Sequence, residues 1–119
     1  MKRLTVVLAV CFILISTVAF AQFRISTDRL TADTAVYTVP TGKIAGICGV
    51  YAEADGTNQA TCAVYDNTAA SGKMFPKVIA AAGEFYGGWQ KSTCVEVKTG
   101  LYLDITGTNA ACWIEYVKP

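Results

Sequence analysis

The sequence predicts an all-β fold, an antiparallel β-sandwich of about seven or eight short strands wound like a jelly roll. Short apolar or alternating stretches recur along the chain at intervals of about ten residues, as in small sandwiches. Clusters of Gly, Asp, Asn and Thr separate these stretches and supply turns. Beyond the N-terminal apolar segment, no stretch of about eleven residues or more carries helical periodicity. One domain with a modest core is therefore expected.

Residues 1–21 are predicted to be a signal peptide, which leaves residues 22–119 as the folded domain. A short basic start precedes an almost unbroken apolar run over residues 4–20, and the tripeptide Ala-Phe-Ala that ends at Ala21 fits the small-x-small cleavage rule. The alternative is a retained membrane anchor. The apolar run is short for that role, because a helix rises by about 1.5 Å per residue and must cross about 30 Å of hydrocarbon.

Residues 22–30 begin with the alternation of an edge strand or an extended arm, and residues 35–40 form a short strand that a proline ends. Residues 42–65 have the pattern of a β-hairpin, with two apolar arms around an Asp-Gly-Thr-Asn turn. The first arm is apolar on both sides, which predicts a central strand. Alternation places on one face Ile44, Cys48 and Val50, and on the other Ile47 and Tyr51.

The middle of the chain contains two predicted strands between two predicted loops. Residues 66–72 are polar and rich in turn residues, and they form the first loop. Residues 74–82 are predicted to be a strand, because the Phe-Pro pair favours extended structure. Residues 84–92 are aromatic and broken by glycines, so we expect a loop. Residues 93–98 alternate cleanly and form the next strand.

The chain closes with two strands, residues 101–106 and 110–117, around a Gly-Thr-Asn turn at residues 107–109. In the first of them, alternation predicts that three side chains point into the core: Leu101, Leu103 and Ile105.

Four cysteines remain once Cys11 leaves with the signal peptide, and an even number in an exported chain indicates two disulfides. They allow three connectivities. The hairpin register favours Cys48 with Cys62, which leaves Cys94 with Cys112. A Cys₄ zinc site is one alternative, although no closely spaced Cys pair exists and export favours oxidation. Four free buried thiols are the other alternative.

The charges of the domain argue against several classes of partner. Without the two basic residues of the signal peptide, 8 basic residues face 9 acidic ones, and no basic run occurs. This balance argues against nucleic acid or an anionic membrane as a main partner. We also expect no stable membrane insertion after cleavage of the signal peptide. The chain contains no histidine, which is the commonest general base and transition-metal ligand.

The carboxylates form no recognisable catalytic arrangement. Asp104 and Glu115 lie on the last two strands as ordinary solvated residues, and Ser71 has no basic partner beside it. The loops of Asp55 and Asp66 would offer oxygen ligands to Ca²⁺ only if they shared one end of the sandwich, and they lack dense Asp spacing. We therefore expect no enzyme activity, no metal and no cofactor.

Three segments of the domain carry a resemblance: VPTG at residues 39–42, VYDNTAASG at 64–72 and GLYLDITGT at 100–108. The chain resembles a family of small β-sandwich proteins encoded by phages and prophages, in which turn motifs of this kind occur. The resemblance covers most of the domain and implies a structural or virion-associated role without catalysis. Structural proteins that assemble in the cytoplasm need neither a signal peptide nor four cysteines, so an exported, surface or particle-associated relative is an equal expectation.

The sequence thus predicts a secreted, periplasmic or particle- or cell-surface module that assembles with copies of itself or with a larger particle. The alternative is a carbohydrate-binding module on residues 84–92. There Tyr86 and Trp89 would bury much area at low entropic cost, unless Trp89 folds back over an open end of the core. Trp113 shares a face with Glu115, which predicts that it lies outside or on a neighbouring subunit.

Overall fold

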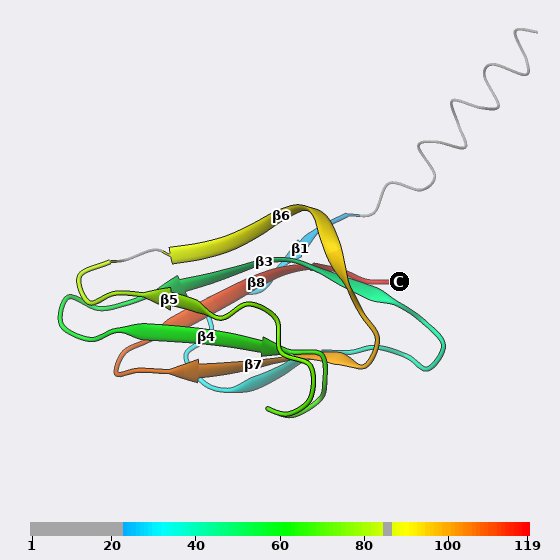
Figure 1. Ribbon diagram of the computed structural model, residues 1–119, viewed down its shortest axis with the longest axis horizontal. Coiled ribbons are helices and arrows are strands. Elements are labelled where there is room, and N and C mark those ends of the chain that lie inside the picture. Colours follow the sequence, from blue (N-terminus) through cyan, green and yellow to red (C-terminus); the bar gives the residue numbers. More distant parts are fainter. Residues whose placement is uncertain (1–22, 85–86) are drawn as a thin grey trace, which may run out of the picture.

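The computed structural model describes residues 23–84 and 87–119, so the predicted signal peptide and its cleavage site lie outside the described residues. In these two ranges the chain forms eight strands in two four-stranded antiparallel sheets, which confirms the predicted β-sandwich (Figure 1). Within these two ranges, no helix has the length and hydropathy to cross a membrane. The strands are β1 (Ile25–Ser26), β2 (Thr34–Thr38), β3 (Ala45–Glu53), β4 (Ala60–Tyr65), β5 (Val78–Ala80), β6 (Gly87–Val97), β7 (Gly100–Thr106) and β8 (Ala111–Val117).

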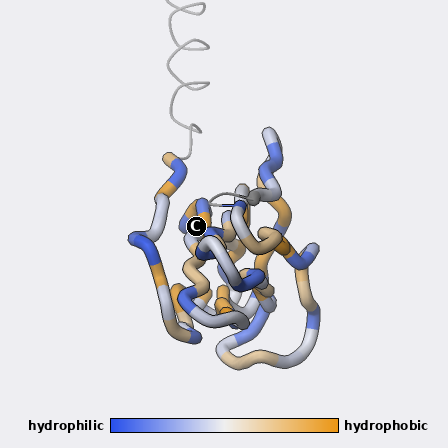
Figure 2. The backbone as a smooth tube through the Cα atoms, turned by 90° about the vertical axis from the view of Figure 1, so that its left-hand side faces the viewer, coloured by the Kyte–Doolittle hydropathy of each residue, from blue (hydrophilic) through white to orange (hydrophobic). Residues whose placement is uncertain are grey.

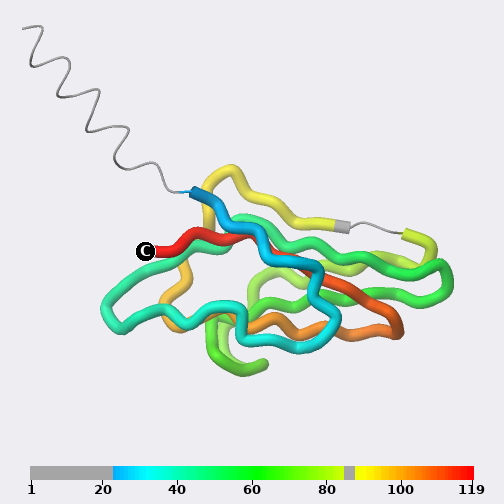
Figure 3. The backbone as a smooth tube through the Cα atoms, turned by 180° about the vertical axis from the view of Figure 1, so that it is seen from behind, coloured from blue at the N-terminus to red at the C-terminus, as the bar shows by residue number. Residues whose placement is uncertain are grey.

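Sheet A has the strand order β1-β8-β3-β6, and sheet B has the order β2-β7-β4-β5. Four antiparallel pairs join early strands to late ones: β1 with β8, β2 with β7, β3 with β6, and β4 with β5. The first half of the chain therefore pairs with the second half in reverse order. Figure 3 shows the arm between β1 and β2, blue to cyan, leaving the side of β8 in one sheet to reach β7 in the other.

The core lies between the sheets and is built from the alternate side chains of their inner faces. Leu101 and Leu103 of β7 are fully buried, as the alternation predicts, while Ile105 is partly buried against the same core. Sheet A contributes fully buried Ile47 and Ile114 from β3 and β8. In Figure 2, which looks along the strands, several of the most hydrophilic segments lie toward the outside.

The predicted hairpin over residues 42–65 is wrong, although both of its arms are strands. β3 is central in sheet A, between β6 and β8, and β4 lies in sheet B, between β5 and β7. The turn around Asp55 therefore connects the two sheets. The prediction that the first arm is central is confirmed. Both arms are largely buried, and crossing between sheets lets each arm line its own side of the core.

A β-bulge in β3 changes which of its side chains face the core. The pairing with β8 runs from Ile47 opposite Tyr116 to Gly49 opposite Glu115, so β3 holds one extra residue at Cys48. Ile47 and Val50 both join the core as a result. Strict alternation predicts opposite faces for Ile47 and Val50, and this prediction is wrong because the bulge brings both side chains to the core face.

The predicted loop at residues 84–92 is wrong from Gly87 onward, because β6 begins there and continues to Val97. Trp89 lies opposite Val50 of β3, on the inner side of the sheet. Pairing with β6 satisfies the backbone N–H and C=O groups along the second edge of the buried strand β3. Gly87 and Gly88 can adopt the extended conformation of a strand. Because glycine has no side chain, they add nothing to the alternating pattern by which a strand is predicted from the sequence.

The strand predicted at residues 74–82 is shorter than expected. β5 covers only Val78–Ala80, and Met74 adds an isolated bridge to Tyr65. The described part of the segment predicted at residues 22–30 also pairs sparsely: β1 contains two residues, and Leu30 makes a separate bridge to Cys112. Both segments lie at sheet edges, where short, interrupted pairing is common.

The two predicted disulfides are present, but the predicted connectivity is wrong. Cys48 of β3 is bonded to Cys94 of β6 within sheet A, and Cys62 of β4 is bonded to Cys112 of β8 across the core. The Cα–Cα distances are 4.2 and 6.0 Å, within or near the usual range for a disulfide. The preferred pairing depended on the hairpin and fails with it. Because all four cysteines are paired, the zinc-site and free-thiol alternatives are excluded.

Candidate functional site

The loops of the sandwich gather at two opposite ends, each held by one aspartate. The Asp55 end contains the turns at residues 54–59, 81–84 and 107–110, on the left in Figure 1. The Asp66 end contains the turns at 40–43, 66–73 and 98–100. Strand β4 runs from one end to the other and separates the two carboxylates. The geometry that a shared Ca²⁺ site requires is therefore absent, and the described residues contain no cluster of three or more metal-ligating side chains.

Asp55 ties two turns together through its carboxylate. The backbone N–H groups of Thr57 and Asn58 donate to Oδ1 at 2.9 and 2.5 Å, and the Asn109 side chain donates to Oδ2 at 2.9 Å. The side-chain amide of Asn58 also donates to the Asp55 carboxylate. Together these bonds, above all those from the side chains of Asn58 and Asn109, hold the pKa of Asp55 far below its usual range. The Asp55 carbonyl also accepts the N–H of Gly83, which joins the third turn to this end.

Arg29 and Glu53 form a two-pronged ion pair beside these turns. Nε and Nη2 of Arg29 donate to the two carboxylate oxygens of Glu53, each at 3.1 Å. The bond raises the pKa of Arg29 and lowers that of Glu53. Both side chains are partly exposed, so the pair adds little to stability. Its consequence is geometric, because the planar guanidinium is held in one orientation.

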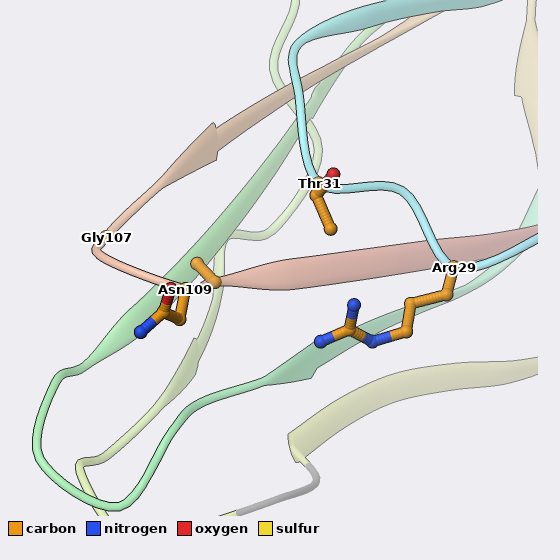
Figure 4. A pocket seen from close by; sticks show the side chains of 5 residues that line it. Arg29, Thr31, Gly107 and Asn109 are labelled. Carbon is orange, nitrogen blue, oxygen red and sulfur yellow. The ribbon is translucent and has the colours of Figure 1, made fainter.

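A pocket of about 310 Å³ opens between the arm that precedes β2 and the β7–β8 turn. Figure 4 shows the Arg29 side chain extending from the arm toward Asn109 on the turn, with the Thr31 side chain above them. Gly107 and Ala110 complete the lining. Asn109 has a positive φ of 55°, which Asn tolerates better than most residues and which shapes this tight turn. The walls are predominantly polar side chains and turn backbone.

An aromatic pair occupies the outer face of sheet A. The rings of Tyr51 and Trp113 are stacked, with centroids 5.6 Å apart and planes 15° from parallel. The Tyr51 hydroxyl donates to Glu115 at 3.2 Å, and Arg24 forms an ion pair with the same carboxylate at 3.7 Å. Trp113 therefore lies outside the core, as the sequence predicts, and its ring is half-buried.

Arg24 also fixes the bulged middle of β6. Between Gln90 and Val95, β6 contains three more residues than the stretch of β3 that it pairs with. The guanidinium of Arg24, which directly precedes the opposite edge strand β1, donates to the carbonyls of Ser92 and Lys91 at 2.6 and 3.1 Å. The extra residues therefore fold over the outer face of sheet A, and the Cys48–Cys94 disulfide fastens them there.

The structure separates the three aromatic residues predicted to bind a ligand. Trp89 is partly buried and packs against the core, which is the arrangement expected if it folds inward. Tyr86 lies outside the described residues. Trp113 stacks on the outer face of sheet A, a different surface from that of Trp89. The three do not form one site in the described residues.

The Asp66 end contains two of the segments on which the phage-type resemblance rests, residues 39–42 and 64–72, and the start of the third at Gly100. The Asp66 carboxylate accepts the backbone N–H groups of Lys98, Thr99 and Gly100, the shortest at 2.8 Å. A Cβ atom on Gly100 would lie 2.9 Å from the carbonyl oxygens of Asn67 and Tyr37, so only glycine fits without a backbone shift. These contacts explain the turn motifs as framework residues that close this end.

We expect Asp66→Ala to lower the free energy of unfolding by about 2 kcal/mol, because it removes the acceptor of several backbone N–H groups. Burial alone would raise the pKa of Asp66. The hydrogen bonds from residues 98–100 and the positive charge of Lys73 outweigh this effect, so the pKa lies below its ordinary value. The charge therefore stabilises the fold fully above about pH 4, and this contribution is lost as the pH falls through the lowered pKa.

The variant Asp66→Asn distinguishes the effect of the negative charge from that of the hydrogen-bond acceptor, because it keeps an acceptor oxygen and removes the charge. Urea unfolding at several pH values should show wild type more stable than Asp66→Asn at pH 7, with the difference shrinking below about pH 4. A difference that stays constant down to about pH 2 contradicts this role for the carboxylate.

Comparisons with known proteins give no relatives. No family model matches the chain, and neither the search of curated proteins nor that of solved structures found a significant match.

Proposed function

We propose that this protein is an exported, non-catalytic structural or interaction module that assembles with copies of itself. The proposal extends to a jelly-roll winding, supported by the reverse-order pairing of early and late strands, and to a phage-like particle or a cell surface as the setting. Two disulfides suit a secreted, periplasmic or surface location. The phage-type resemblance supports a role in assembly.

The observation that carries the proposal is a pair of exposed apolar side chains at one end of sheet A. Phe23 is 89% exposed and Ile44 is 53% exposed. Because Ile25 pairs with Tyr116 in an antiparallel register, Phe23 lies beyond the C-terminal end of β8. Ile44 immediately precedes β3. Both residues therefore lie at the Asp66 end. Large apolar groups exposed at the same end of a sheet are candidates for an interaction surface.

A groove beside Ile44 offers a place for such an exposed group. Its volume is about 360 Å³, and it lies next to the Cys48–Cys94 disulfide. The lining residues are Ile44, Ala45, Gly46, Cys94, Glu96 and Val117. We call it the Ile44 groove. One chain supplies both a groove bordered by the apolar side chains of Ile44 and Val117 and an exposed aromatic ring, Phe23, which favours a second copy as the partner.

We expect the purified, oxidised protein to form a multimer that Ile44→Asp converts to a monomer, because the new charge would be buried in the contact. Light scattering after size-exclusion chromatography measures the mass. Ile79→Asp is the matched control, since Ile79 is 54% exposed on edge strand β5 of the other sheet. It should leave the multimer intact. A monomeric wild type, or equal loss of mass in both variants, contradicts assembly through the Ile44 groove.

Carbohydrate binding is the second candidate function, and the structure shifts its basis to another aromatic residue. Trp89 packs against the core, whereas Trp113 lies on the outer face of sheet A, stacked with Tyr51. Stacked aromatic rings on a rigid sheet are a surface to which sugar rings bind well. Retention on immobilised glycans that Trp113→Ala abolishes and Trp89→Ala preserves would support this candidate.

A further inference from the structure

The pocket at the Asp55 end presents fixed hydrogen-bonding groups of both kinds. The bonds from Arg29 to Glu53 use Nε and Nη2, so in the described part of the chain the N–H groups of Nη1 remain for a ligand. Asn109 turns its Nδ2 toward Asp55. A carboxylate only accepts hydrogen bonds, so this orientation is chemically required and leaves Oδ1 as an acceptor.

The groups in this pocket are held before any ligand arrives. Glu53 holds the guanidinium with two bonds, and Asp55 holds the carboxamide while it is itself anchored by backbone N–H groups. Side chains fixed in this way lose little conformational entropy on binding. Such support is typical of a preorganised binding site.

The charges around the pocket favour a neutral ligand. Glu53 balances the positive charge of Arg29, and the Asp55 carboxylate beside Asn109 is ionised. The arm itself carries two further carboxylates, Asp28 and Asp33. An anionic ligand would approach more negative than positive charge here, which opposes its binding.

We propose that this pocket, lined by Arg29, Thr31 and Asn109, binds one unit of a neutral saccharide. Sugar hydroxyls both donate and accept hydrogen bonds, which matches a pocket lined by a guanidinium donor and a carboxamide acceptor. A volume of about 310 Å³ is at the small end of ligand pockets and suits a single sugar ring. The inference rests on the second candidate function and names its site and ligand class.

Trp113 lies close enough to extend the site along the sheet. Tyr51 is paired with Trp113, and Glu53, the partner of Arg29, is paired with Ala111. The two pairs are two residues apart on the same face of sheet A, a spacing of about 7 Å. A second sugar unit of an oligosaccharide therefore has the aromatic pair within reach.

A glycan array tests the proposal with the full, oxidised protein. The probes are neutral oligosaccharides of glucose, galactose, mannose and N-acetylglucosamine, beside sulfated and sialylated glycans. We expect binding to at least one neutral glycan and at least tenfold weaker binding in Arg29→Lys, which keeps the charge and loses the planar fork. Thr31→Leu, which adds bulk at the pocket, should weaken binding similarly. Thr68→Leu, an exposed threonine at the Asp66 end, should not.

The outcomes separate this pocket from the function on which it rests. Binding that Trp113→Ala abolishes but Arg29→Lys and Thr31→Leu leave unchanged supports carbohydrate binding and overturns the pocket. Preference for sulfated or sialylated glycans overturns the neutral class. No binding to any glycan on the array overturns both. Thermal melting of each variant confirms that it is folded.

Discussion

Replacing Cys62 and Cys112 together by alanine is expected to lower the free energy of unfolding by about 4 kcal/mol or more. This disulfide closes a loop with a sequence separation of 50 residues, for which the loss of chain entropy in the unfolded state predicts about 4 kcal/mol. Both cysteines are fully buried, so the substitution also removes packed sulfur atoms from the core. This bond also joins the two sheets covalently.

The Cys48→Ala/Cys94→Ala variant is a matched control for loop length, because its sequence separation is 46 residues. The entropic contributions of the two disulfides should be nearly equal. Cys94 is only partly buried, so we expect this variant to lose less stability than the Cys62/Cys112 variant. Urea unfolding of both double variants measures the difference. A Cys62/Cys112 variant as stable as wild type contradicts the role of the cross-sheet bond.

The substitution Gly107→Ala is expected to cost about 4 kcal/mol, at the upper end of single-residue effects. Gly107 has a φ of 124°, a conformation that side-chain-bearing residues rarely adopt. A Cβ atom there would overlap the carbonyl oxygen of Gln59, which is backbone and has little room to move. The turn that positions Asn109 would have to shift.

Two glycines at the same end of the sandwich separate the causes. Gly56 has no atom within 4 Å of a built Cβ and an ordinary φ, so Gly56→Ala should change stability little. Gly83 has equal space but a φ of 86°, so Gly83→Ala should cost about 1 kcal/mol from backbone strain alone. Chemical denaturation should rank Gly107→Ala as the most damaging. Equal stability of Gly107→Ala and Gly56→Ala would contradict the described turn.

The sequence predicts much of the fold because alternation is directly visible in several strands. Leu101 and Leu103 are buried as their spacing indicates, and the closing strand over residues 110–117 appears as β8. The even number of cysteines correctly indicates two disulfides. These signals are local, and each depends on only a few neighbouring residues.

The remaining features depend on contacts between distant segments. The extra residue at Cys48 reverses the faces of β3, and no local pattern marks a bulge. Pairing with β3 makes a strand of the glycine-rich segment around Trp89. The disulfide connectivity follows from the sheet order, because Cys62 and Cys112 belong to strands of opposite sheets. Such pairings cannot be read from spacing along the chain.

The candidate sites show the same limit. Arg29 lies on an arm without a recognisable motif, and Asn109 looks like an ordinary turn residue in the sequence. They line one pocket because the arm pairs with β8 near Cys112. The turn residues around Asp66 are visible in the sequence, but they form the framework of the opposite end.

Native mass spectrometry of the protein recovered from its producing cells tests the central claim of an exported, disulfide-braced, assembling module most directly. The account predicts a multimer of chains that begin at Gln22, each lighter by the four hydrogens that two disulfides remove. A full-length monomer with all five cysteines as free thiols would contradict the export, the disulfides and the assembly together.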